Sequence, residues 1–140
     1  MISAASNQVS TKLGTPPVPQ SPWHILVYSH THWDREWYQS FERFRMQLIG
    51  CVDRILDLLE TDERFTCFVL DGQTIVIDDY LAIRREARNR IERLTQGGRL
   101  EVGPWYILPD EFLVSAESFV RNLQAGSRGA TARGGAPRVG

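Results

Sequence analysis

Three short apolar segments alternate with three longer segments of helical periodicity, and this alternation restricts the fold more than any other feature. The apolar segments are HILVYSH (24–30), RFTCFVLDG (64–72) and RLEVGPWYILP (99–109). The helical segments cover about 40–60, 74–98 and 115–126. Strands that alternate with helices at this spacing pair in parallel through right-handed crossovers. The sequence therefore predicts an α/β chain of three β/α units with parallel strands.

The apolar residues of each helical segment predict which face is buried. In the first segment they fall at i, i+4, i+7, i+8 and i+11, at Leu48, Val52, Ile55, Leu56 and Leu59. The second segment is predicted to be one helix that ends at Gly97–Gly98, with one apolar face made of Tyr80, Ile83, Ala87, Ile91 and Leu94. The third helix is expected to begin after Ser115, whose hydroxyl suits an N-cap.

The two ends of the chain differ from the middle. Residues 1–22 are polar and contain four prolines, which predicts a disordered leader before a single partial domain at 23–140. The tail GSRGATARGGAPRVG (126–140) has no periodicity and is expected to be a loop, or an approach to a strand that is cut short. Three β/α units do not close a barrel, so the chain is interpreted as the first part of a larger α/β barrel or sheet.

Composition excludes several classes of partner. The net charge is −1, and the arginines of 84–93 alternate with glutamates, which is typical of a solvated helix face and not of a nucleic-acid site. The sequence has no signal-peptide pattern and no apolar run of about 18 residues, so we expect a cytoplasmic protein without a membrane partner. Cys51 and Cys67 are too few for a disulfide framework and are predicted to be buried, reduced thiols.

The segment YSHTHWDREWY (28–38) carries the most chemistry. His30, His32 and Asp34 alternate at the end of the first predicted strand. Side chains at i, i+2 and i+4 of an extended segment point the same way, and parallel α/β folds place their sites at the carboxyl ends of the strands. Zinc binds neutral imidazole nitrogen and carboxylate oxygen. The spacing alone is as typical of a metal site as it is of polar residues that bind no ligand.

Two aromatic residues follow this segment. Trp37 and Tyr38 either stack on the apolar face of a sugar ring or form the hydrophobic start of the next helix. The residues alone leave both interpretations open.

Three blocks, in this order, resemble the N-terminal catalytic domain of glycoside hydrolase family 38, the retaining α-mannosidases, and in particular its bacterial members. They are HTHWDREWY (30–38), FVLDGQTIVIDDYL (68–81) and GPWYILPDEFLVSAESFVRNLQAG (103–126). The resemblance implies a seven-stranded α/β barrel with zinc held by two Asp and two His. It implies that His32 and Asp34 bind Zn²⁺ and that Trp37 packs against mannose, whereas His30 is not a ligand.

The resemblance also implies retaining hydrolysis by a carboxylate nucleophile and a second carboxyl that acts as acid and base. The family's nucleophile and the two other zinc ligands are expected beyond Gly140, so no catalytic residue is assigned here and the chain alone is expected to be inactive. Asp71 and Asp110–Glu111 lie at the active end of their strands, but Asp71–Gly72 is typical of a turn and Asp110–Glu111 of an approach to a helix.

The leading hypothesis is therefore part of a zinc-dependent α-mannosidase that acts on a mannose-containing oligosaccharide or glycoside. The alternatives are a non-catalytic carbohydrate-binding or remnant fragment and a metallohydrolase of amidohydrolase type, in which His-x-His also ends a first strand. Homo-oligomerisation of the complete protein stays open.

Overall fold

The computed structural model describes residues 23, 25 and 27–135, and the expected leader at 1–22 lies outside them. The elements follow in the order β1 (Ser29–His30), α1 (Phe41–Thr61), β2 (Phe68–Leu70), α2 (Ile75–Leu81), the short 3-10 helix η1 (Arg85–Ala87), α3 (Arg88–Gln96), β3 (Leu100–Val102) and α4 (Ala116–Thr131).

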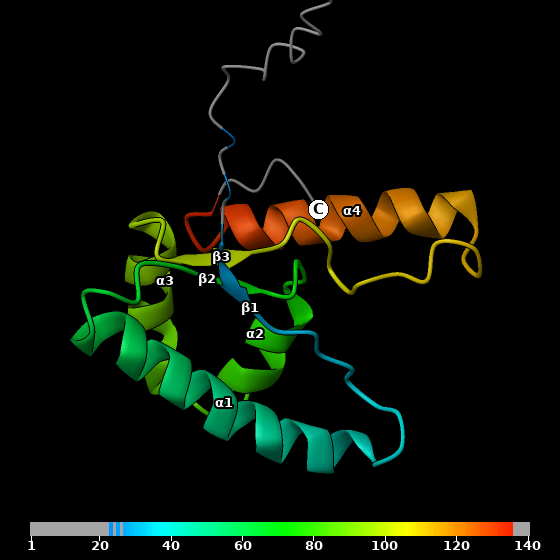
Figure 1. Ribbon diagram of the computed structural model, residues 1–140. Helices are drawn as coiled ribbons and strands as arrows, with labels where there is room; N and C mark the ends of the chain where they lie inside the picture. The colour runs from blue at the N-terminus through cyan, green and yellow to red at the C-terminus, as the bar shows by residue number, and fades with distance from the viewer. Residues whose placement is uncertain (1–22, 24, 26, 136–140) are drawn as a thin grey trace, which may run out of the picture.

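The three strands form one parallel sheet in the order β1-β2-β3 (Figure 1). Ser29 pairs with Phe68, and Phe68 in turn pairs with Leu100. The α/β class and the parallel pairing predicted from the alternation are thus confirmed. The segments that leave the carboxyl ends of β1 and β3 extend to the same side of the molecule.

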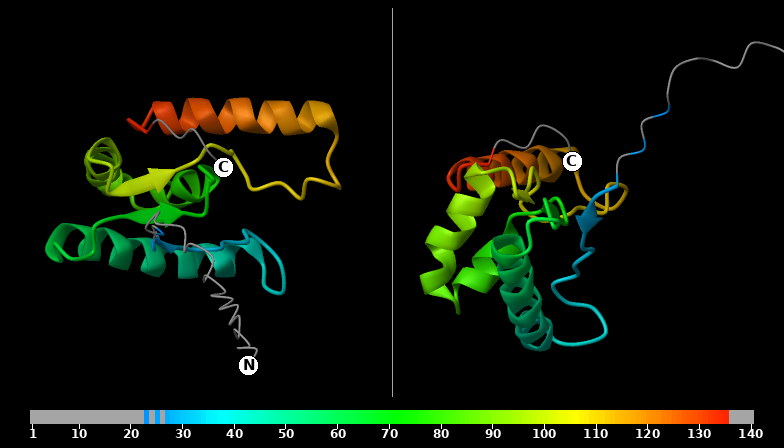
Figure 2. Two further views of the ribbon diagram at one scale, coloured as in Figure 1. Left: turned by 45° about the horizontal axis from the view of Figure 1, so that its top comes forward. Right: turned by 60° about the vertical axis from the view of Figure 1, so that its left-hand side comes forward.

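Helices flank the sheet, with α1 and α4 on opposite sides of the strands (Figures 1 and 2). All five residues of the predicted α1 stripe are buried, and they belong to one hydrophobic core with the inward residues of the strands, α2 and α3. None of the helices in the described part of the chain is long and apolar enough to cross a membrane.

The first strand is much shorter and more exposed than its apolar run predicts. It spans only Ser29–His30, and both residues are exposed. Ile25 and Val27 before it are 85% and 90% exposed, while His24 and Leu26 lie outside the described residues. A strand buried on both faces was expected here, and that prediction is wrong for the described residues. β1 lies at the edge of the sheet, paired with β2 alone, and neither of its residues belongs to the hydrophobic core.

The single helix predicted for 74–98 is divided in two. Helix α2 ends at Leu81, and Arg84 leaves the helical region (φ −103°, ψ 59°) before η1 and α3 begin. Ile83, expected on the apolar face, is 49% exposed. The residues of α2 are buried almost all round, whereas α3 buries only one face. Both halves pack on α1, and α3 packs on β3 as well.

The expected loop at 126–140 is also partly wrong, since α4 continues to Thr131. Close packing against a neighbouring backbone requires a glycine at position 126, inside this helix. A Cβ there would lie 2.0 Å from the backbone carbon of Trp105 and 2.2 Å from the carbonyl oxygen of Pro104. The helix therefore packs directly on the backbone that follows β3. Its predicted start is confirmed, because Ser118 N–H donates to Ser115 Oγ at 3.2 Å.

The cysteines are free, as predicted, but both are half-buried instead of fully buried. Burial raises the pKa of the Cys51 thiol, which keeps it protonated and unreactive at neutral pH.

Candidate active site

A pocket of about 770 Å³ lies at the carboxyl ends of the strands. Its walls are residues 32–36, which follow β1, Gln73, which follows β2, residues 107–110, which follow β3, and Phe41 at the start of α1. Every strand of the sheet thus contributes to one pocket, at the end where parallel α/β folds place their sites.

His32 and Asp34 lie close together in this pocket. His32 Nε2 is 3.5 Å from Asp34 Oδ2, and the two side chains are 65% and 38% exposed. His30 does not join them: its Nδ1 lies 3.0 Å from the carbonyl oxygen of Thr31, and its ring faces Tyr28. The strand ends at His30, so the extended geometry that would align all three side chains is lost, and only two of them converge.

Asp71 is the third polar side chain at this point, and the sequence did not identify it as part of the site. Its Oδ2 accepts hydrogen bonds from Trp33 N–H at 2.6 Å and from Gln73 Nε2 at 2.7 Å. Its Oδ1 lies 3.5 Å from His32 Nδ1, and the side chain is only 8% exposed. Asp71 is indeed in a turn, with a left-handed φ of +50°. Its position at the active end of the second strand was evident from the sequence, but the Asp71–Gly72 turn pattern favoured a structural role over a place in the site.

Gln73 connects the segments that surround the pocket. Its side chain is buried, at 1% exposure for the residue. Its Nε2 donates to Trp33 O at 2.8 Å as well as to Asp71, and its Oε1 accepts from Leu108 N–H at 3.2 Å. One amide therefore holds the segments after all three strands at fixed distances from one another.

Arg35 lines the pocket, but Asp79 of α2 neutralises its charge. Arg35 Nε and Nη2 donate to the two carboxylate oxygens of Asp79 at 2.6 Å and 2.9 Å. These hydrogen bonds raise the pKa of Arg35. The guanidinium also lies 4.7 Å from the ring centre of Phe41. This pair attaches the segment that bears His32 and Asp34 to α2.

Trp37 and Tyr38 are 74% and 75% exposed. Trp37 is therefore not enclosed by the first helix, which removes the core interpretation of this residue. It does not line the pocket described above, however, and its contact with a sugar stays a prediction. Trp33, by contrast, packs edge-on against Phe44 of α1, with ring centres 6.2 Å apart, and anchors the segment in the core.

Negative charge around the pocket is not balanced by cations. Asp34, Glu36 and Asp110 line it, and no Lys or Arg of the described residues lies within 4.0 Å of their carboxylates. Glu111 is exposed and does not line the pocket. No group of three or more metal-capable side chains occurs within residues 23, 25 and 27–135. His32 and Asp34 thus form at most half of a four-ligand site.

Comparison with known proteins identifies the family. Residues 22–137 match the model of the glycosyl hydrolases family 38 N-terminal domain. A protein of Halalkalibacterium halodurans named "Putative mannosylglycerate hydrolase" is 53% identical over 103 residues, which are 74% of this chain and 11% of that protein.

Two solved structures from Enterococcus faecalis share the fold. One is an alpha-mannosidase (48% identity, TM-score 0.76), of which 12% is covered by 79% of this chain. The other is a protein of glycosyl hydrolase family 38 (44% identity, TM-score 0.74), of which 13% is covered by 81% of this chain. The chain spans about an eighth of the length of these relatives. It belongs to glycosyl hydrolase family 38, whose N-terminal domain its sequence matches from residue 22 to residue 137.

Proposed function

We propose that this chain provides the first part of the active site of a zinc-dependent retaining α-mannosidase. The observation that carries the proposal is the approach of His32 Nε2 to Asp34 Oδ2 at the carboxyl end of β1, within the segment that matches the family. The amidohydrolase alternative does not agree with that family membership.

The distance between the two side chains suits zinc. Two donors that each lie about 2.0–2.2 Å from a tetrahedral Zn²⁺ are separated by about 3.3–3.6 Å. His32 Nε2 and Asp34 Oδ2 are 3.5 Å apart, which is longer than an ordinary hydrogen bond. The uncompensated carboxylates of the pocket favour a cation in the same place.

The zinc, when bound by His32, Asp34 and two further ligands, would hold hydroxyl groups of the mannose and favour a distorted ring. The described residues prepare the site for this. Arg35 and Asp79 fix the segment that carries the ligands, and Gln73 fixes the spacing of the three walls. Asp110, in the segment after β3, also lines the pocket.

In this proposal the three β/α units are consecutive units of a seven-stranded barrel, and the nucleophile and two zinc ligands come from residues outside this chain. Retaining hydrolysis needs two carboxyl groups about 5–5.5 Å apart. The substrate is a mannose-containing glycoside or oligosaccharide in the cytoplasm, in agreement with the mannosyl compounds in the names of the relatives.

Substitution of the two ligands tests the proposal in the protein that contains the complete catalytic domain. We expect His32→Ala and Asp34→Ala each to abolish zinc retention, measured by elemental analysis, together with hydrolysis of a chromogenic α-mannoside. His30→Ala is the matched control, because that ring faces Tyr28 and not the pocket. Full zinc content and activity in either ligand variant would refute the metal assignment.

Trp37→Ala tests the sugar-binding role separately. We expect kcat/KM to fall while the zinc content stays unchanged. Tyr38→Ala is the control, because Tyr38 is equally exposed but packs edge-on against Phe44 at 5.2 Å. Equal losses in both variants would indicate a general effect on the segment and would argue against a sugar contact.

A further inference from the structure

We propose that Asp71 is a positioning residue for His32, which holds the imidazole with its proton on Nδ1 and its free nitrogen, Nε2, toward Asp34. The inference rests on the proposed function, because it assigns the partner of a proposed zinc ligand.

The imidazole ring of His32 lies between two carboxylates. Its Nδ1 is 3.5 Å from Asp71 Oδ1, and its Nε2 is 3.5 Å from Asp34 Oδ2. A neutral imidazole carries one N–H, and the hydrogen bond made at one nitrogen decides which nitrogen remains free. A zinc ion needs that free nitrogen on the side of Asp34.

The two carboxylates are not equivalent. The side chain of Asp71 is 8% exposed, whereas that of Asp34 is 38% exposed. A buried carboxylate is less screened by water and attracts an N–H more strongly. The environment therefore favours the proton on the nitrogen that faces Asp71.

Asp71 is held in place by groups other than His32. Its Oδ2 is held by Trp33 N–H and by the buried amide of Gln73. These two bonds leave Oδ1 directed at the imidazole. The 3.5 Å separation is slightly too long for a formed hydrogen bond, and the His32 side chain, which is 65% exposed, has room to rotate toward the carboxylate. The carboxylate is the fixed partner and the imidazole is the one that adjusts.

An outer carboxylate of this kind orients a metal-binding histidine and raises its basicity, and its loss typically lowers metal affinity 10–100-fold. The competing explanation is that Asp71 only stabilises its turn and the Trp33 backbone. Asp71→Asn separates the two. The amide oxygen can still accept from Trp33 N–H and Gln73, but the amide nitrogen then faces His32 Nδ1 as a donor. The variant keeps the structural bonds and reverses the polarity toward the imidazole.

The tautomer of His32 is the direct readout, and it needs no metal. The 140-residue chain has three histidines, so ¹⁵N-labelled histidine gives few signals, and His32→Gln assigns the relevant one. At alkaline pH, where free histidine is neutral, we expect N–H on Nδ1 in the wild type and on Nε2 in Asp71→Asn. Glu36→Gln removes the same charge from the same pocket and should leave the tautomer unchanged, because the ion pairs of His32 within the described residues go to Asp34 and Asp71 and not to Glu36.

Zinc affinity gives the second readout. It is measured by competition with a chromophoric chelator in the protein that contains the complete catalytic domain, because two of the proposed ligands come from residues outside this chain. We expect it to fall 10–100-fold in Asp71→Asn and to change less than about threefold in Glu36→Gln, whose charge is exposed to solvent.

The two readouts separate this inference from the proposed function. A wild-type His32 with its proton on Nε2 would overturn the role of Asp71 without recourse to any variant. An unchanged tautomer and zinc affinity in Asp71→Asn would overturn it as well. A tautomer that switches, while the complete catalytic domain binds no zinc, would support the positioning role and count against the zinc assignment instead.

Discussion

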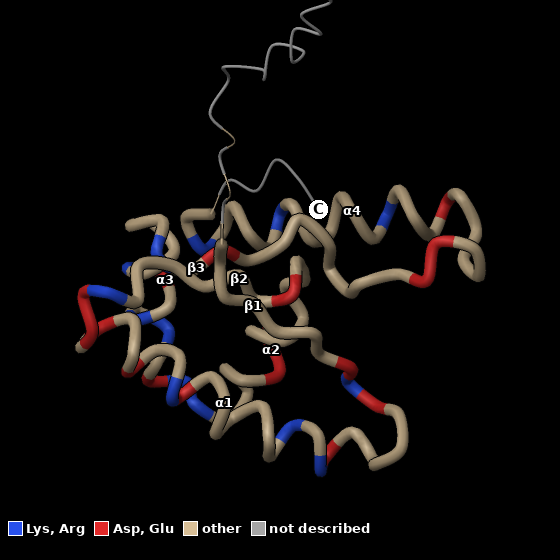
Figure 3. Tube along the Cα trace, in the orientation of Figure 1, with Lys and Arg blue, Asp and Glu red and all other residues tan. Residues whose placement is uncertain are grey.

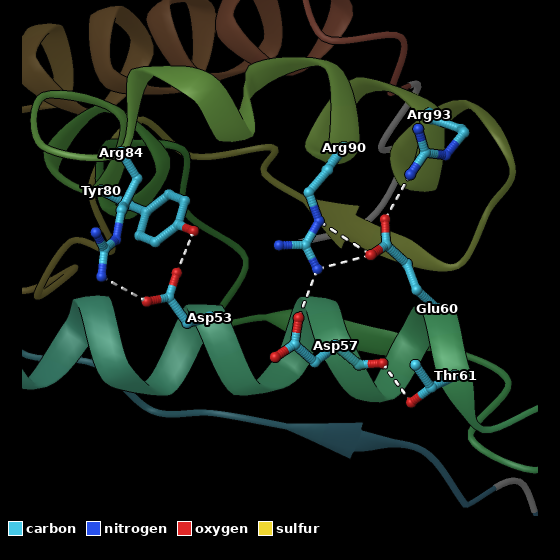
Figure 4. A network of polar contacts seen from close by, with 8 residues as sticks. All are labelled: Asp53, Asp57, Glu60, Thr61, Tyr80, Arg84, Arg90 and Arg93. Atoms are coloured by element: carbon cyan, nitrogen blue, oxygen red, sulfur yellow. Dashed lines mark hydrogen bonds and ion pairs between the residues drawn. The ribbon is translucent and has the colours of Figure 1, made fainter.

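The acidic residues of two regions differ in whether they pair with arginines. One region is the surface between α1 and α2–α3, and the other is the pocket at the strand ends. Between the helices, Asp53 accepts from Tyr80 Oη at 2.6 Å and from Arg84 at 3.1 Å, while Arg90 and Arg93 bind the acids of the next turns of α1, Asp57 and Glu60 (Figure 4). Around the pocket, the carboxylates of Asp34, Glu36 and Asp110 have no such partner within the described residues.

The same difference appears along the chain trace. Blue and red positions alternate where α1 faces α3, whereas red positions predominate in the segments after β1 and before α4 (Figure 3). The arginine of the pocket, Arg35, is bound by Asp79. The acids that pair with arginines join helices, whereas the acids of the pocket have no arginine partner within the described residues.

The strongest way to disturb the pocket side is through backbone packing. Gly126→Ala places a Cβ 2.0 Å from the Trp105 carbon, so α4 must move away from the segment after β3. We expect a loss of about 3 kcal/mol or more in the free energy of unfolding, at the upper end of overpacking effects. Urea denaturation measures it. Gly50→Ala in α1, with no atom within 4 Å of its Cβ, should be neutral or slightly stabilising.

The ion pair of the pocket side should be the next most costly to break. Arg35→Met leaves Asp79, 10% exposed, without its bidentate partner. We expect a loss of about 1–3 kcal/mol, since a buried acceptor remains unpaired. Arg43→Met, at an exposed position of the neighbouring helix, is the control. Equal stability of the two variants would show that Arg35 does not anchor the segment.

On the helical side, a buried hydroxyl should matter more than the exposed charges. Tyr80 is fully buried, and burial together with its bond to Asp53 raises its pKa. Tyr80→Phe removes that bond but keeps the ring, so we expect a loss of about 1 kcal/mol. Thermal unfolding at neutral pH measures it, and a stability gain would argue against the bond.

The smallest effect should come from Glu60. The hydrogen bond from Arg90 lowers its pKa, so its contribution is complete above the ordinary pKa of a glutamate and is lost as the pH falls through the lowered value. Glu60→Gln should cost about 0.5–1 kcal/mol at pH 7 and nothing at pH 2. A difference that persists in acid would mean that charge is not the cause.

Local patterns predicted much of the helical structure. The apolar stripe of α1 and the cap at Ser115 depend on residues close in sequence, and both are present in the structure. The short range of these interactions is why spacing reveals them. The division of 74–98 into two helices was missed because it depends on what each half packs against.

The sequence by itself determined the alternation of parallel strands and helices, the family, and the pairing of His32 with Asp34 as candidate ligands. Only the tertiary structure decided that Asp71, 39 positions after His32, faces the same imidazole, that Gln73 joins three separate segments, and that a glycine is required at position 126. These contacts join residues that parallel pairing brings to one end of the sheet. The spacing of residues along the chain does not reveal the distance between residues that follow neighbouring strands.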